Sequence, residues 1–204
     1  MSQLLIATWN PGKFREFRQM LSDLPFAFVS LAEVPGTKPV LETGGTFVEN
    51  ASLKATQYAG QSGLLTLADD SGLEVDALEG APGVWSARYG GEGASDRERI
   101  EMLIAALKSV APPYRSARFV SVIVLASSVG RVLNTSVGKC EGQIATEPRG
   151  TGGFGYDSIF IPAGWDKTFA ELRAEIKNRI SHRSAALRNT RKFLKNLTHD
   201  SAGG

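Results

Sequence analysis

The sequence predicts an α/β fold, and three observations support this prediction. Short apolar runs, typical of buried strands, alternate with amphipathic segments that have helical spacing. Three helix-start signals, each a hydroxyl residue followed three places later by glutamate, recur along the chain. The composition is that of a globular protein, with 42% hydrophobic and 22% charged residues. We expect one domain over residues 1–204, with the last few residues frayed.

The first part of the chain has the order strand, helix, strand, helix, strand. Apolar runs at residues 3–8, 26–31 and 64–68 predict strands, and the last of them ends at Asp69-Asp70-Ser71-Gly72. Helical spacing over residues 11–24 follows an Asn-Pro-Gly turn, because proline suits the first helical position. The pair Thr46 and Glu49 predicts a second helix that runs to about Gly60.

The second part predicts a helix, a hairpin and a helical end. Residues 79–94 are rich in glycine and proline and predict an ordered functional loop. A capping pattern at Ser95 opens the next helix, and residues 115–127 and 132–140 predict a long β-hairpin. A glycine-dense segment precedes a short strand at residues 158–161, and helix is expected from Thr168 to Leu197.

Charge and cysteine content exclude several classes of protein. The formal net charge is +2, too small to imply a polyanionic partner. The single cysteine, Cys140, excludes an internal disulfide and a zinc site built from several cysteines. We find no signal peptide and no apolar run of the ~20 residues needed to span a bilayer. We therefore expect a protein of a reducing compartment, the cytoplasm.

Asp69-Asp70-Ser71-Gly72 is the first candidate for chemistry. Two adjacent carboxylates follow an apolar strand, and ligands bind where strands of α/β sheets end. Mg²⁺ is commonly held by one or two carboxylates together with substrate phosphates. The alternative is a solvated turn, since these residue types favour turns.

The turn before the first predicted helix is a candidate for binding phosphate. Lys13 lies in the first turn of a predicted helix, where backbone amides and the helix dipole attract anions. The alternative is a simple Asn-Pro-Gly turn with a surface lysine. A separate polar group lies on the next predicted helix, where Lys54 follows Glu49. The helix cap accounts fully for Glu49, and the alternative for Lys54 is a solvated lysine on an exposed face, whereas Glu42 in the loop before the helix has no local structural role.

The segment Gly150 to Asp157 is a candidate for binding a nucleobase. Its glycines permit close backbone approach, and Phe154 and Tyr156 offer ring faces beside Asp157. A glycine-rich loop with buried aromatics is the competing interpretation. Residues 167–195 carry a net charge of +7, which could attract a polyanion or could be a solvated helix face.

Taken together, these segments resemble the inosine triphosphate pyrophosphatase family, also described as XTP/dITP diphosphatases. The resemblance runs from about Leu4 to Leu197, and Trp9 is a departure, since members more often have another residue there. The motifs that carry it lie at residues 7–13, 42–44, 46–51, 53–55, 68–73, 80–83, 86–89, 150–157 and 181–183.

The resemblance implies a central mixed β-sheet flanked by helices, with two lobes around a nucleotide cleft, and a homodimer. It implies Mg²⁺-dependent hydrolysis of ITP, dITP and XTP to the monophosphate and pyrophosphate. Asp70 would be the catalytic acid–base group. The metal candidates are Glu42, Asp70 and Asp69, with Glu49 in support. The implied substrate-binding residues are Thr8, Trp9, Asn10, Pro11, Gly12, Lys13 and Lys54 for the triphosphate, and Ser71, Phe154, Gly155, Tyr156, Asp157, Lys177, His182 and Arg183 for sugar and base.

Two alternatives remain open. One is a related nucleotide pyrophosphatase of the Maf-like type, with a pyrimidine or modified base as substrate. The other is a nucleic-acid-binding module that uses the basic C-terminal segment, which would give no reason for Asp69, Asp70 and Glu42. We expect no stable nucleic-acid or membrane partner.

Overall fold

The structure is a computed structural model that describes residues 2–200, and it describes the side chains of residues 2–197. The fraying expected of the last few residues lies outside this range at residues 201–204. The helices and strands are β1 (Ser2–Ala7), α1 (Pro11–Met20), β2 (Phe26–Ser30), α2 (Phe47–Ser62), β3 (Leu65–Val75), α3 (Asp96–Ala106), β4 (Ser116–Ala126), β5 (Val132–Ile144), β6 (Phe160–Pro162), α4 (Ala174–Ile180) and α5 (His182–Asp200).

The strands form one mixed sheet in the order β2-β1-β3-β4-β5-β6. β1 pairs in parallel with both β2 and β3, whereas β5 and β6 pair antiparallel. This confirms the predicted α/β class with a central mixed sheet flanked by helices. The chain divides into two compact units: unit 1 is residues 1–70, 121–138 and 183–204, and unit 2 is residues 71–120 and 139–182. The expectation of one folding domain stays a prediction.

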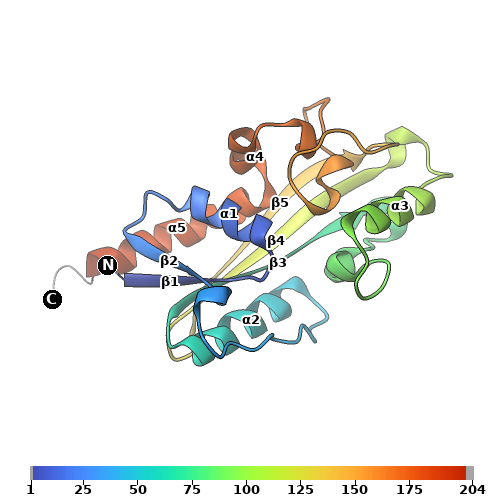
Figure 1. Ribbon diagram of the computed structural model, residues 1–204. Helices are drawn as coiled ribbons and strands as arrows, with labels where there is room; N and C mark the ends of the chain where they lie inside the picture. The colour runs from blue at the N-terminus through green and yellow to red at the C-terminus, as the bar shows by residue number, and fades with distance from the viewer. Residues whose placement is uncertain (1, 201–204) are drawn as a thin grey trace. The chain divides into compact units, whose positions relative to one another are not determined.

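Unit 1 places helices on both faces of its strands. Figure 1 shows α1 and α5 on one face of β1 and β2, and α2 on the other. Phe17 from α1, Leu21 directly after that helix, and Leu187 and Leu194 from α5 are buried in one apolar cluster with side chains of β1, β3 and β4. Burial of such side chains from water is the main favourable contribution to folding.

The helix starts of unit 1 agree with the sequence signals. The Asn10 side chain accepts a hydrogen bond from the amide of Lys13 at the start of α1. Thr46 and Glu49 form the reciprocal capping box of α2, which ends at Gly63 with φ +66°. Glycine suits this left-handed position because it has no Cβ to clash.

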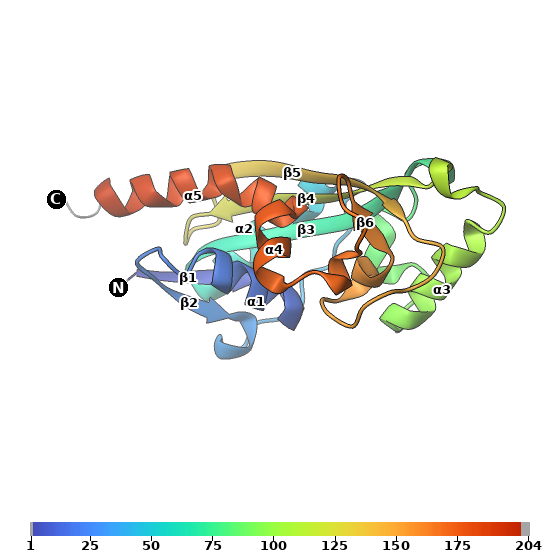
Figure 2. The ribbon, with the colours of Figure 1, turned by 90° about the horizontal axis from the view of Figure 1, so that it is seen from above.

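Unit 2 has its own apolar core. Leu73 and Val75 from β3, Leu103 from α3, Leu107 directly after that helix, and Phe160 from β6 are buried in it. Figure 2 shows β6 and the loops around it between α4 and α3, and the short helical turn at Gly155–Ser158 contacts α3. The glycine-dense segment is thereby held against a helix.

Two local predictions are wrong. The sequence predicts a strand that ends before Asp69, but β3 continues to Val75, so Asp69, Asp70 and Ser71 lie in strand conformation. The capping pattern at Thr168 opens only one helical turn, Phe169–Glu171, and α4 starts afresh later. The Ala170 carbonyl accepts the Gly152 amide instead of continuing a helix.

No helix within the described residues combines the length and apolar character needed to cross a membrane.

Candidate active site

Two adjacent aspartates of β3, each paired with a lysine, form the centre of the candidate site in unit 1. Successive side chains of a strand point to opposite faces of the sheet. Asp69 meets Lys13 of α1, with 2.7 Å between carboxylate oxygen and Nζ, whereas Asp70 meets Lys54 of α2 at 2.8 Å. The helices that supply the lysines lie on opposite faces of the strands (Figure 1). The alternative of a solvated turn is wrong, because these residues lie in a strand and each carboxylate is paired with its own lysine.

Asp69 is fully buried and hydrogen-bonded through both oxygens. Its Oδ2 accepts from Lys13, and its Oδ1 accepts from the hydroxyl of Ser121 on β4 at 2.5 Å. Arg183 Nε lies 3.6 Å from Oδ2. Burial by itself raises the pKa of Asp69, but the charges of Lys13 and Arg183 and the two hydrogen bonds outweigh it and hold the pKa well below the usual range.

The turn before α1 is held beside Lys13 by two side-chain oxygens. Thr8 Oγ1 accepts the Asn10 amide at 3.1 Å, and Asn10 Oδ1 accepts the Lys13 amide at 3.0 Å. The Trp9 indole donates to the Tyr58 hydroxyl at 2.9 Å, although the residue is 51% exposed. Burial, together with repulsion from Lys54 and Arg183, lowers the pKa of Lys13 despite the attraction of Asp69. The arrangement suits an anion at the start of α1.

Lys54 bridges two carboxylates. Its Nζ donates to Asp70 Oδ1 and to Glu42 Oε1, both at 2.8 Å, and its side chain is 10% exposed. Burial lowers the pKa of Lys54, but the two carboxylates outweigh it and raise the pKa overall. Burial raises the pKa of Asp70 despite the opposing charges of Lys54 and Lys13.

The second oxygen of Asp70, Oδ2, is a buried acceptor that no donor of the described residues reaches. A buried acceptor without a donor is costly in free energy, so this atom is suited to a cation or a water molecule. No cluster of three or more His, Cys, Asp or Glu side chains able to hold a metal occurs within the described part of the chain. Glu42 and Asp70 alone fit the binding mode in which Mg²⁺ takes one or two carboxylates and substrate phosphates.

The loop that carries Glu42 is held by the start of α2. The Gly44 amide donates to Asn50 Oδ1 at 2.8 Å, and Glu49 Oε2 accepts the amides of Gly45 and Thr46. A Cβ at Gly44 would lie 2.6 Å from the Glu49 Cβ, so the loop packs tightly there. The capping function accounts for Glu49 in this structure.

The predicted base-binding residues of the glycine-dense segment lie in unit 2. Asp157 Oδ2 accepts the Phe154 amide at 2.9 Å and also the ammonium of Lys177. The Lys177 Nζ lies over the Phe154 ring, 4.7 Å from its centroid, and 5.6 Å from that of Phe169. The rings and the carboxylate together fix the position of the Lys177 ammonium.

Other predicted residues of unit 2 are packed nearby. The His182 ring stacks on Phe119 with centroids 4.6 Å apart, and the Tyr156 hydroxyl donates to the Ser86 carbonyl at 2.9 Å. Ser71 follows Asp70 on β3. Arg183, which belongs to unit 1, is buried and donates to the Glu16 carboxylate.

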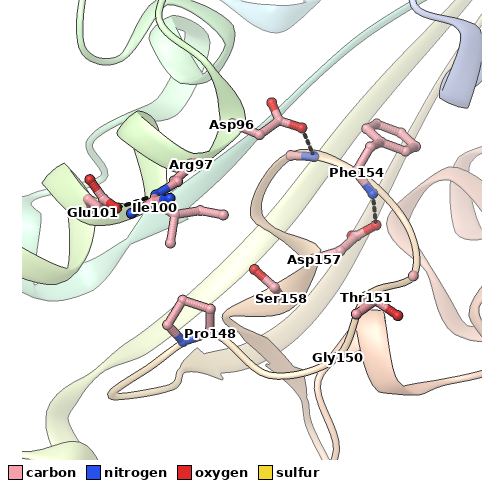
Figure 3. A pocket seen from close by; sticks show the side chains of 12 residues that line it. Asp96, Arg97, Ile100, Glu101, Pro148, Gly150, Thr151, Phe154, Asp157 and Ser158 are labelled. Atoms are coloured by element: carbon pink, nitrogen blue, oxygen red, sulfur yellow. Dashed lines mark hydrogen bonds and ion pairs between the residues drawn. The ribbon is translucent and has the colours of Figure 1, made fainter.

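A pocket of about 500 Å³ lies in unit 2 beside the glycine-dense segment, as Figure 3 shows. The Asp96 carboxylate of α3 accepts the Gly155 amide at 2.6 Å at its edge. The lining residues are Asp96, Arg97, Ile100, Glu101, Pro148, Gly150, Thr151, Gly152, Phe154, Gly155, Asp157 and Ser158.

The structure therefore groups Thr8 to Lys13, Glu42, Lys54, Asp69, Asp70 and Arg183 in unit 1. It groups Ser71, Phe154 to Asp157, Lys177 and His182 in unit 2. Sequence reasoning missed Glu16 and Ser121. Glu16 could have been found from its position three residues after Lys13 on the same helix. Ser121 could have been noticed as a single hydroxyl residue within the apolar run of β4.

Comparisons with known proteins give one consistent family. A family model described as the Ham1 family matches residues 4–193. A dITP/XTP pyrophosphatase of Desulforamulus reducens is 47% identical over 195 residues, covering 96% of each chain. One of Bacillus subtilis is 46% identical over 194 residues, covering 95% of this chain and 98% of that protein. The structure of a HAM1 protein from Coxiella burnetii aligns with a TM-score of 0.82 and 44% identity, covering 98% of this chain and 100% of the other.

Proposed function

Because the chain belongs to the Ham1 family, we propose that it is a nucleoside triphosphate pyrophosphatase that hydrolyses dITP, XTP and ITP to the monophosphate and pyrophosphate. Its task would be to remove deaminated purine nucleotides from the precursor pool. Beyond the likeness, one observation supports the proposal most. Asp70 Oδ2 is buried and accepts no hydrogen bond from the described residues, while the other oxygen of the same carboxylate is held by Lys54, which also binds Glu42.

The triphosphate would bind at the start of α1. The segment Thr8, Trp9, Asn10, Pro11, Gly12 and Lys13 supplies the start of α1 and one ammonium, and Lys54 supplies a second. Charge on the transferred and leaving phosphate oxygens must be neutralised during phosphoryl transfer. The two lysines would supply part of that neutralisation.

Glu42 and Asp70 would hold Mg²⁺, and the bound ion would neutralise phosphate oxygens and lower the pKa of a neighbouring water. Asp70 Oδ2 would accept a proton from the attacking water molecule while the water oxygen forms its bond to the α-phosphorus. The bond from that phosphorus to the bridging oxygen then breaks, and pyrophosphate leaves with the electron pair. Asp69, the third metal candidate, has both oxygens engaged by Lys13 and Ser121, which favours a different role.

Sugar and base would bind to Ser71, Phe154, Gly155, Tyr156, Asp157, Lys177, His182 and Arg183. Hypoxanthine and xanthine carry a 6-oxo group, whereas adenine carries a 6-amino group. A donor such as Arg183, His182 or Lys177 at that position would pair with the oxo group and leave adenine mispaired. Sites built on such hydrogen bonds discriminate by ~10⁴ or more.

The proposal extends to a homodimer and to the cytoplasm. Both rest on the family resemblance and on the substrate, since nucleotide precursors are consumed inside the cell. Light scattering coupled to size-exclusion chromatography tests the dimer: a mass of twice 21.9 kDa is expected, and a monomer would contradict it.

The decisive experiment measures pyrophosphate release from dITP, ITP, XTP, dATP, dGTP and dTTP, with Mg²⁺ and with a chelator. Release from the first three alone, abolished by the chelator, is expected. Release chiefly from dTTP or from modified pyrimidines would favour the Maf-like alternative. Comparable release from all six would remove the base-reading role of Lys177, His182 and Arg183.

The Asp70→Asn variant separates the enzyme from a nucleic-acid-binding module. We expect hydrolysis to fall by about 10²–10⁴-fold, the usual contribution of a general base. A binding module would lose nothing. Two arginines of the basic segment are already paired with carboxylates from elsewhere in the chain, Arg183 with Glu16 and Arg191 with Asp23, which weakens the case for a module.

A further inference from the structure

The Gly155 amide, in the proposed base-binding turn, is held by a side chain from another element. It donates to Oδ2 of Asp96, the first residue of α3, at 2.6 Å. Figure 3 shows this bond at the edge of the pocket. Hydrogen bonds that an ionised carboxylate accepts are about twice as strong as those between neutral groups. Spacing in the sequence cannot indicate this contact, because the two residues are 59 positions apart.

The Asp96 carboxylate is itself anchored through its other oxygen. Its Oδ1 accepts from Arg99, three residues later on α3. The same guanidinium donates to the carbonyls of Ala87 and Ala94, at 2.8 and 2.5 Å, in the loop before α3. The Arg99 side chain is 18% exposed, so it is largely packed. Arg99 therefore fixes the direction in which Asp96 meets the turn.

Packing does not hold Gly155 in place. A Cβ on this residue would meet no atom of the described residues within 4 Å, and its φ of +59° lies in the left-handed region that glycine adopts readily. The residues on either side are held separately: the Phe154 amide from within the turn, and the Tyr156 hydroxyl by the Ser86 carbonyl at 2.9 Å. The bond to Asp96 is therefore a specific restraint on the backbone between these two residues.

The pocket of about 500 Å³ leaves room beside the turn. Asp96 and Gly155 both line it, together with Phe154 and Asp157 of the proposed base-binding set. A close-packed interior would hold the turn whatever its hydrogen bonds, because such interiors leave few voids. Next to a pocket, the turn can shift when one hydrogen bond is lost. A shift would also move the Phe154 ring, whose centroid lies 4.7 Å from the Lys177 ammonium.

We propose that Asp96 is a positioning residue for the nucleobase: it fixes the backbone of the base-binding turn through the Gly155 amide, and Arg99 fixes Asp96. The inference rests on the proposed function, since it takes this turn to bind the base. Asp96 acts through the turn and not by contact with the substrate. The alternative is that Asp96 serves only the start of α3, where an acidic side chain interacts favourably with the helix dipole.

The first test is Asp96→Ala, which removes the acceptor. We expect KM for dITP and Kd for the product dIMP each to rise about tenfold, near the lower limit for losing a hydrogen bond to a charged group, because the Asp96 side chain is 47% exposed. The value of kcat and the inhibition by inorganic pyrophosphate with Mg²⁺ should each stay within about twofold, because the phosphates would bind in unit 1. Unchanged dIMP affinity, or an equal loss of pyrophosphate inhibition, would overturn the inference.

Asp96→Asn tests the same contact with a smaller change. A neutral amide oxygen can still accept from Gly155, at about half the strength of a carboxylate, so both constants should rise only about threefold. Thermal unfolding of each variant shows whether it is folded. If Asp96→Ala does not fold, Asp96→Asn decides the proposal, and unchanged KM and dIMP affinity in that variant would overturn it.

The matched control is Glu98→Gln. Glu98 is also an acidic residue in the first turn of α3, but its carboxylate accepts the Ser95 amide at 2.7 Å and not an amide of the base-binding turn. Loss of its charge weakens the start of the helix, as loss of Asp96 does. Its KM and dIMP affinity should equal those of the unsubstituted protein. An equal rise in both variants would favour the role in the helix start and overturn the proposal.

A double-mutant cycle shows whether Arg99 acts through Asp96. Arg99→Met alone should raise KM for dITP by about threefold, because Asp96 keeps its charge but loses its anchor. In an Asp96→Ala background the same change should alter KM by less than about twofold, since the carboxylate that it orients is gone. An undiminished effect in that background would overturn the part assigned to Arg99. If the unsubstituted protein releases no pyrophosphate from any purine nucleotide, the proposed function itself fails, which is a separate outcome.

Discussion

Lys54→Met removes the ammonium that bridges Glu42 and Asp70 and should destabilise the fold. Removing one partner of a buried ion pair typically costs about 3–5 kcal/mol, because the other charge is left buried. The Asp70 side chain is 8% exposed and that of Glu42 is 31% exposed, so water can compensate Glu42 in part. We therefore expect a loss near the lower limit, about 3 kcal/mol. For a chain of this size that corresponds to a fall in Tm of roughly 6–12 °C.

The loss should depend on pH with a defined sign. Burial already raises the pKa of Asp70, and Lys54 opposes that rise. Without Lys54 the pKa of Asp70 in the folded state rises further above the unfolded value, so stability falls as pH increases through this range. Urea denaturation of the metal-free protein should show a larger deficit at pH 8 than at pH 5.5.

The control is Arg97→Met, which breaks the exposed Arg97–Glu101 pair and should leave Tm unchanged. Mg²⁺ should raise the Tm of Lys54→Met more than that of the unsubstituted protein, because two carboxylates lose their ammonium partner. A deficit no larger than that of Arg97→Met, or one that grows as pH falls, would refute this account of the Asp70 site.

Two further predictions concern packing. Gly44→Ala should raise the Mg²⁺ concentration for half-maximal hydrolysis about tenfold, because a Cβ there meets Glu49 and Asn50 at 2.6 and 2.8 Å and displaces the loop of Glu42. Gly45→Ala, whose Cβ would have its nearest contact at 3.7 Å, is the control and should not change it. Burial raises the pKa of the Cys140 thiol to about 11, so a thiol reagent at pH 8 should label the native protein slowly and the urea-unfolded protein at once; rapid native labelling would contradict this.

The sequence predicts the helix starts well because caps are local. Asn10, Thr46 and Ser95 each accept a backbone amide within three residues, so the signal and the structure occupy the same few positions. Helix ends that depend on contacts with distant parts of the chain are predicted less well. Thr168 has the same pattern as Thr46, but only one turn follows it, because Gly152 takes the Ala170 carbonyl that a longer helix would need.

The aspartates of β3 show why a local pattern can predict the wrong element. Asp-Asp-Ser-Gly favours a turn when only neighbouring residues are considered. In the folded chain, Lys13 and Lys54 arrive from helices on either side of the sheet and neutralise the two charges, which permits the strand to continue. Ser121, 52 positions away, completes the partners of Asp69 and cannot be identified from spacing.

The same pair of aspartates also shows how one strand can separate two tasks. Asp69 has a donor on each oxygen and no exposed surface, so it can only hold the groups around it. Asp70 has one oxygen on Lys54 and one buried oxygen that no donor of the described residues reaches, so it can accept a proton or bind a cation. Because strand geometry points the two side chains to opposite faces, the carboxylate proposed to react stays apart from its neighbour, which is held by two donors. With the proposed roles, a catalytic loss from Asp69→Asn should appear in substrate binding, whereas that from Asp70→Asn should appear in kcat.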